Sequence, residues 1–120
     1  MIKFFTAAIV LFALVSCKHK TDFSSLKEVS YSTEIVPIIN ANCTFSGCHG
    51  ASEAESFKLL SYNDVMDAGV NEGSPEKSKF YNSLKSLKQE KIMPRLPYSP
   101  LTDAQILSIY VWIGQGAKNN

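Results

Sequence analysis

The first apolar stripe of the chain predicts a helix that ends at a cysteine. Ile35, Ile38 and Ile39 follow one another at the i, i+3, i+4 spacing of an amphipathic helix. Ser32 precedes this stripe and is the expected N-cap, because a serine side chain can accept a hydrogen bond from the free backbone N–H groups of a first turn. The pattern therefore predicts an amphipathic helix that places Cys43 at its C-terminal end.

Two shorter stripes follow in the middle of the chain. Ser61 is expected to cap a short helix over residues 62–68, and Gly69 is expected to close it. A second helix is predicted over residues 78–87, where apolar side chains again recur at helical spacing. Its apolar positions are Phe80, Tyr81, Leu84 and Leu87.

The last stripe has the clearest boundaries. Thr102 and Gln105 have the spacing of a capping box, and Leu101 and Ile106 fit the hydrophobic staple that often accompanies one. Two glycines within residues 114–116 are expected to end the helix. The successive helical stripes predict a small all-α domain. The apolar face of this last helix comprises Ile106, Ile109, Tyr110 and Ile113.

The N-terminal residues form a separate segment. Lys3 precedes an apolar run over residues 7–15, which is too short to span a bilayer and is typical of an export signal. Residues 14–17, Leu-Val-Ser-Cys, also resemble the lipobox of bacterial lipoproteins. That resemblance implies cleavage before Cys17 and diacylation of its thiol, which would anchor the exported protein to a membrane through buried methylenes. The alternative is a plain secretory signal followed by a chance cysteine.

The domain organisation follows from this segment. We expect a lipoprotein signal peptide over residues 1–16, a polar tether over residues 17–28 that starts at the lipidated Cys17, and one folded domain over residues 29–120. The folded part is small, near the size at which metals, disulfides or cofactors often supplement the core.

Net charge excludes one class of function. The chain of 120 residues has 12 Lys and Arg against 11 Asp and Glu, so it lacks the basic excess of a nucleic-acid-binding protein. The same balance argues against a polybasic protein that binds membrane surfaces through charge. We therefore expect no nucleic-acid partner.

The strongest chemical signal is a pair of cysteines followed directly by a histidine. Cys43 and Cys48 are separated by four residues, and His49 comes next. The common haem-attachment signal, Cys-x-x-Cys-His, attaches haem through two thiols and binds iron through the histidine, and Gly47 supplies freedom for a longer loop. A Cys43–Cys48 disulfide is the second interpretation, because the protein is expected to be exported. A zinc site is the third, but it would need further ligands.

A methionine lies in a stiff loop further along the chain. Three prolines within seven residues follow Met93 and exclude a regular helix over residues 94–100. Its neighbours would then hold Met93 in place, which suits a thioether that binds iron weakly. The alternative role for Met93 is to fill a gap in the core. The other methionine of the folded part, Met66, is expected to pack in a short helix.

Taken together, these segments resemble class I mono-haem cytochromes c, and most closely the group often called Planctomycete-type cytochrome c domains. The resemblance spans about residues 30–117. The matching segments are residues 34–39 (Glu-Ile-Val-Pro-Ile-Ile), 48–50 (Cys-His-Gly), 78–81 (Ser-Lys-Phe-Tyr), 93–94 (Met-Pro) and 112–117 (Trp-Ile-Gly-Gln-Gly-Ala).

The resemblance implies a helical domain wrapped around one covalent haem c. Cys43 and Cys48 would form the thioethers, and His49 and Met93 would be the axial ligands of the iron. The implied function is electron transfer to redox partner proteins of a respiratory or oxidoreductase chain, by a carrier that is not itself an enzyme. The proline that often follows the motif is absent here, so the sequence does not identify the group that orients His49.

Two other functions remain open from the sequence. The chain would be a haem subunit of a larger oxidoreductase if its iron kept an open coordination position. It would be a haem-free lipoprotein, acting as a binding or structural module, if Cys43 and Cys48 formed a disulfide.

Overall fold

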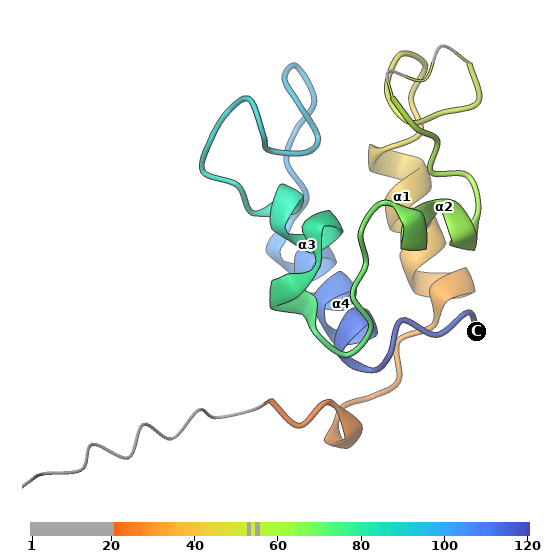
Figure 1. Cartoon of the computed structure of the whole chain (residues 1–120), viewed down its shortest axis with the longest axis vertical. Coiled ribbons are helices and arrows are strands. Elements are labelled where there is room, and N and C mark those ends of the chain that lie inside the picture. The colour runs from red at the N-terminus through yellow and green to blue at the C-terminus, as the bar shows by residue number, and fades with distance from the viewer. Residues whose placement is uncertain (1–20, 53, 55) are drawn as a thin grey trace, which may run out of the picture.

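The structure is a computed structural model that describes residues 21–120 apart from residues 53 and 55. This part of the chain is helical and contains no strand, which confirms the all-α prediction. Short turns of 3-10 helix (η1 and η3) and one π-helical turn (η2) accompany the α-helices (Figure 1). In chain order the elements are η1 (Phe23–Ser25), η2 (Tyr31–Ile35), α1 (Val36–Asn42), α2 (Tyr62–Asp67), η3 (Pro75–Lys77), α3 (Lys79–Leu84) and α4 (Asp103–Gly114).

The first helix begins earlier than predicted, and Ser30 caps it in place of Ser32. The Ser30 hydroxyl accepts a hydrogen bond from the Thr33 N–H at 3.3 Å, and the chain then makes the π-helical turn η2 before it continues as α1. Ser32 lies inside that turn, and its N–H donates to the carbonyl of Asn120. An N-cap needs an extended backbone, which Ser30 has. The helix does end at Cys43, as predicted.

Helices α2 and α4 confirm the predicted caps. Thr102 and Gln105 form a capping box at the start of α4, with each side chain accepting a hydrogen bond from the other residue's N–H. Ser61 caps α2 and forms a second capping box with Asp64. Gly69 has a positive φ of 96° two residues after the end of α2, a conformation that favours glycine.

Helix α3 is shorter than the predicted helix over residues 78–87. It ends at Leu84, and Leu87 is fully exposed. The buried side chains of α3 are Phe80, Tyr81 and Leu84, so the apolar stripe stops one turn earlier than the sequence pattern. Leu87 therefore belongs to the loop that follows α3.

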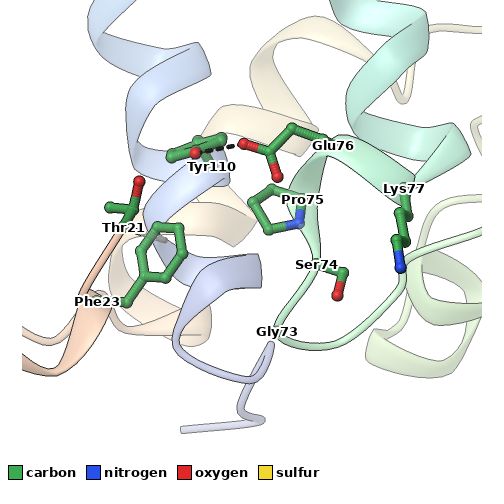
Figure 2. Close-up of a pocket in the computed structure, with 8 residues that line it drawn as sticks. All are labelled: Thr21, Phe23, Gly73, Ser74, Pro75, Glu76, Lys77 and Tyr110. Carbon is green, nitrogen blue, oxygen red and sulfur yellow. Dashed lines mark hydrogen bonds between the residues drawn. The ribbon is translucent and has the colours of Figure 1, made fainter. Parts of the chain in front are cut away.

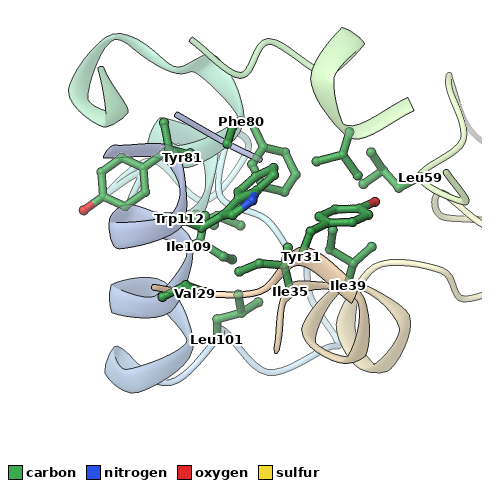
Figure 3. Close-up of a cluster of buried hydrophobic side chains, with 14 residues drawn as sticks. Val29, Tyr31, Ile35, Ile39, Leu59, Phe80, Tyr81, Leu101, Ile109 and Trp112 are labelled. Carbon is green, nitrogen blue, oxygen red and sulfur yellow. The ribbon is translucent and has the colours of Figure 1, made fainter. Parts of the chain in front are cut away.

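The core lies where η2, α3 and α4 meet, with Trp112 at its centre (Figure 3). Trp112, Ile35 and Ile113 each expose 1% or less of their surface. The Tyr31 ring lies 5.5 Å from the Trp112 ring, and the indole N–H donates to the carbonyl of Lys118 at 2.9 Å. Burial of these large side chains, with the indole N–H satisfied, provides most of the stabilisation of such a small domain.

The segment just before the core lies against α4. The side-chain amide of Gln115 donates to backbone carbonyls of residues 23–27, and its oxygen accepts a hydrogen bond from the Val29 N–H. Phe23 packs on Gly114, where a Cβ atom would clash with the Phe23 ring. Residues 23–28, assigned to the tether in the sequence analysis, are thus held on the domain surface. The expected signal peptide and the lipidated Cys17 lie outside the described residues.

Two loops extend from the helices at the opposite end of the domain from residues 21–26 (Figure 1). The Cys loop (residues 43–50) follows α1, and the Met loop (residues 85–100) connects α3 to α4. Within the described residues no helix is long and apolar enough to cross a bilayer.

Candidate functional site

One pocket between the Cys loop and the Met loop brings together all four residues that the sequence singled out for haem. The Cys loop contributes Cys43, Cys48 and His49 to the pocket lining, and the Met loop contributes Met93. The surface inside this pocket is mainly apolar, and its volume is about 40 Å³. Its remaining lining residues are Asn42, Pro94 and Arg95.

Backbone hydrogen bonds fold the Cys loop into a compact turn. The Cys48 N–H donates to the carbonyl of Phe45 at 3.0 Å, and the His49 N–H donates to the carbonyl of Cys43 at 3.1 Å. A Cβ atom on Gly50 would clash with the carbonyl oxygen of Thr44, so the chain can close this turn only with glycine there. The four residues between the cysteines therefore form a folded loop that brings both thiols to the pocket.

His49 is buried, with 9% of its surface exposed, and one of its ring nitrogens has a fixed partner. Its Nδ1 lies 2.9 Å from the carbonyl oxygen of Phe57, and the Phe57 ring stacks on the imidazole at 4.4 Å. In the tautomer that carries hydrogen on Nδ1, this nitrogen donates to the carbonyl and leaves Nε2 with a free lone pair. That arrangement is typical of a metal-binding histidine.

Phe57 is the residue that sequence reasoning missed. No proline closely follows Cys48 and His49, so the sequence did not identify a carbonyl that orients the histidine. In the structure the carbonyl belongs to a phenylalanine eight residues after His49. A sequence does not reveal which backbone carbonyl will accept from a histidine, because every residue has one. The aromatic ring that stacks on His49 is the feature that distinguishes Phe57.

Met93 lies outside any helix, and a backbone hydrogen bond to α3 holds it in place. Its N–H donates to the carbonyl of Ser83 at 2.9 Å, which fixes the Met loop to the last turn of α3. The side chain is half-buried and packs against the core cluster. Met66 also packs against the core cluster, from α2, and it does not line the pocket.

The two thiols are free, and both are half-buried. Cys43 packs against the core cluster at the end of α1. Burial, with a smaller contribution from the nearby Cys48, raises the pKa of the Cys43 thiol to about 11. Cys43 is therefore a protonated, weakly nucleophilic thiol at neutral pH.

The donor set fits haem better than it fits a bare metal ion. Among the described residues no three His, Cys, Asp or Glu side chains are grouped closely enough to hold one ion, which is what zinc requires. Haem needs a different arrangement, with two thiols, an imidazole with a free nitrogen and a thioether spread around one apolar pocket. The pocket as it stands would admit only a few water molecules, so its walls would have to part to receive a macrocycle.

A larger cavity, of about 470 Å³, lies elsewhere, between the N-terminal segment, η3 and α4 (Figure 2). The Tyr110 hydroxyl donates to Glu76 there at 2.5 Å. No thiol, imidazole or thioether lines it, so it lacks the chemistry of the smaller pocket. Its lining residues are Thr21, Phe23, Gly73, Ser74, Pro75, Glu76, Lys77 and Tyr110.

Comparison of the chain with models of protein families, with curated proteins and with solved structures found no match. Function is therefore argued from the pocket and its residues.

Proposed function

We propose that this protein is a membrane-anchored, exported electron carrier that holds one covalent c-type haem between the Cys loop and the Met loop. The observation that carries the proposal is that Cys43, Cys48, His49 and Met93 line one apolar pocket. Met93 is more than forty residues from the cysteine pair in sequence. Such a set of donor side chains is not expected around one pocket of a small domain by chance.

Each residue would have a distinct role in holding the haem. Cys43 and Cys48 would form the two thioether bonds, which would prevent loss of haem from a small and open domain. His49 would bind the iron through Nε2, with Nδ1 held by the Phe57 carbonyl. Met93 would supply a thioether to the iron from the Met loop. When bound, the haem would supply a reversible one-electron couple, and His/Met ligation raises its reduction potential.

The protein would control access to the iron. His49 from the Cys loop and Met93 from the Met loop would both hold the iron and leave little room for dioxygen or peroxide to bind, which is the reason for proposing a carrier rather than an enzyme. The apolar surface of the pocket would exclude water and so further raise the potential.

Membrane attachment would leave the pocket accessible to partners. Residues 21–26 lie at the end of the domain opposite the two loops (Figure 1). A lipid on Cys17 would thus hold the domain by the end remote from the haem, and redox partner proteins would approach the other end. The proposed location is a membrane facing the periplasm or the cell surface.

The deciding experiment is a pyridine haemochrome spectrum after acid–acetone extraction. The full chain would be expressed in an exporting host that has c-type haem maturation. We expect the haem to stay with the protein, and we expect a Cys43→Ser, Cys48→Ser double variant to lose it on extraction. Wild-type protein that retains no haem would contradict the proposal, subject to one control.

The control addresses the unusual cysteine spacing. A variant that lacks Phe45 and Ser46 has two residues between the cysteines, the spacing that maturation machinery commonly recognises. If this variant acquires haem and the wild type does not, the host has rejected the longer loop and the pocket is still competent. If neither acquires haem, the pocket does not attach it.

The second candidate function is a haem-free lipoprotein with a Cys43–Cys48 disulfide, acting as a binding or structural module. The small volume of the pocket favours it, because the pocket walls then need not part to admit a macrocycle. Intact mass of the native protein separates the two candidates. A disulfide removes the mass of two hydrogens, whereas covalent attachment adds the mass of one haem to the peptide that holds both cysteines.

A further inference from the structure

Two aromatic rings connect the Cys loop to the Met loop beside the pocket. The rings of Phe45 and Tyr98 are stacked, with centroids 4.6 Å apart and planes inclined by only 5°. Phe45 lies between the two cysteines, and Tyr98 lies among the prolines after Met93. We refer to this pair as the aromatic bridge (Phe45 and Tyr98).

The backbone of each residue of the pair is hydrogen-bonded to a residue of one pocket wall. The carbonyl of Phe45 accepts from the N–H of Cys48 at 3.0 Å, and the carbonyl of Arg95 accepts from the N–H of Tyr98, also at 3.0 Å. Cys48 and Arg95 both line the pocket. The aromatic bridge therefore links residues that are adjacent to the two walls of the pocket.

The aromatic bridge lies on the C-terminal side of Met93 in the Met loop. Near its middle, the loop is fixed by the hydrogen bond from the Met93 N–H to the Ser83 carbonyl. Residues 95–100, which follow Pro94, are exposed, with Leu96 at 74%. Tyr98 is only 36% exposed, in keeping with the cover that the Phe45 ring gives it.

We propose that Phe45 and Tyr98 are positioning residues that hold the Met loop against the Cys loop and so keep Met93 in place as an iron ligand; this inference rests on the proposed function. A thioether is a weak ligand, so its binding depends on a loop that is already in position. The four-residue spacing then has a purpose, because it supplies the position that Phe45 occupies between the cysteines.

The test is the affinity of the ferric protein for added imidazole, which competes with Met93 for the iron. Phe45→Ala and Tyr98→Ala should each raise this affinity roughly threefold to tenfold, the range that corresponds to the loss of one aromatic pair. Both variants should also weaken the charge-transfer absorption of the iron–thioether bond. Tyr98→Phe keeps the ring and should restore wild-type behaviour.

A matched control and a double variant decide whether the pair acts as a unit. Leu87→Ala removes a fully exposed side chain of the same loop and should leave imidazole affinity unchanged. The Phe45→Ala, Tyr98→Ala double variant should bind imidazole no more tightly than either single variant. Additive single effects, or losses of stability with unchanged imidazole affinity, would overturn the inference and leave the two rings a merely structural role.

Failure of the proposed function is distinguishable from failure of this inference. If the wild-type protein is purified without haem, amide hydrogen exchange of Met93 and Tyr98 replaces imidazole binding as the measurement. Both N–H groups are hydrogen-bonded in the structure. Faster exchange of both in Phe45→Ala, and not in Leu87→Ala, would support the aromatic bridge without the haem. Unchanged exchange would overturn it.

Discussion

The helical core and the two loops of this protein are held together by different interactions. In the core, Trp112 and its neighbours expose almost no surface, and capping boxes define the starts of α2 and α4. In the loops, backbone hydrogen bonds, prolines and one stacked ring pair set the conformation, while Leu87 and Leu96 remain exposed. Folding and assembly of the candidate site are therefore separable, and substitutions should affect one without the other.

The largest effect on stability is expected in the core. Trp112→Ala should lower the free energy of unfolding by about 3–5 kcal/mol, because it leaves a large cavity and removes the hydrogen bond to the Lys118 carbonyl. Urea denaturation followed by circular dichroism measures this. Leu87→Ala is the control and should change the free energy of unfolding by less than about 0.5 kcal/mol. Similar values for the two variants would show that the core is not centred on Trp112.

The next largest effect on stability is expected at Gly50, where the Cys loop turns. Gly50→Ala places a methyl group against the Thr44 carbonyl oxygen, and we expect a cost of about 1–3 kcal/mol together with displacement of the adjacent His49. The variant should therefore also attach less haem than the wild type.

Gly47→Ala is the matched comparison in the same loop. Its Cβ atom would meet no neighbour within 4 Å, although the backbone φ of 77° imposes a cost of about 1 kcal/mol. Urea denaturation and haem yield should both rank Gly50→Ala as the more damaging of the two. The reverse order would mean that the close approach to Thr44 does not constrain the loop.

Met93→Ala should affect the site far more than the fold. The side chain is half-buried, so its removal should lower the free energy of unfolding by only about 1 kcal/mol. In haem-loaded protein the iron–thioether absorption should vanish and the reduction potential should fall. Met66→Leu, which keeps a side chain of similar volume in α2, should leave the spectrum unchanged. An unaltered low-spin spectrum in Met93→Ala would show that another group is the ligand.

The fold was predictable where a local signal acts alone. The caps at Ser61 and Thr102 follow from residue type and spacing, and the structure confirms both. The prediction that Ser32 is the N-cap was wrong, because Ser30 and Ser32 are both suitable residues for that position. Only the extended backbone of Ser30 and the contact of Ser32 with Asn120 distinguish them. The predicted helix end at Leu87 was wrong, because the periodicity of apolar residues does not show at which turn a helix stops packing against other elements.

The candidate site was predictable only in part. Residue chemistry singled out Cys43, Cys48, His49 and Met93, and these four residues do line one pocket. Their roles toward haem stay a prediction. The Phe57 carbonyl could not be found from the sequence, because a backbone oxygen carries no residue-specific signal. The Phe45–Tyr98 contact joins residues more than fifty apart, which no local pattern reports.

The smallest effect on the free energy of unfolding is expected from the solvent-exposed hydrogen bond between Tyr110 and Glu76. The hydrogen bond from the Tyr110 hydroxyl lowers the pKa of the Glu76 carboxyl below its ordinary value of 4.5. A lowered pKa in the folded state contributes stability above pH 4.5, and that contribution is lost as the pH falls through the lowered value. Tyr110→Phe should therefore cost no more than about 0.5 kcal/mol at pH 7, because the pair is exposed to solvent.

The pH dependence of this cost is the sharper measurement. Wild type and Tyr110→Phe should converge in stability as the pH falls below the range in which Glu76 ionises, because a protonated carboxyl loses the charge-assisted hydrogen bond. Urea denaturation at a series of pH values between 7 and about 3 follows the difference. Glu76→Gln should show the same small loss of stability at pH 7, and its difference from the wild type should likewise shrink as the pH falls. A difference between wild type and Tyr110→Phe that stays constant across this range would mean that the Tyr110 hydroxyl contributes through its hydrogen bond with Thr21 rather than through ionised Glu76.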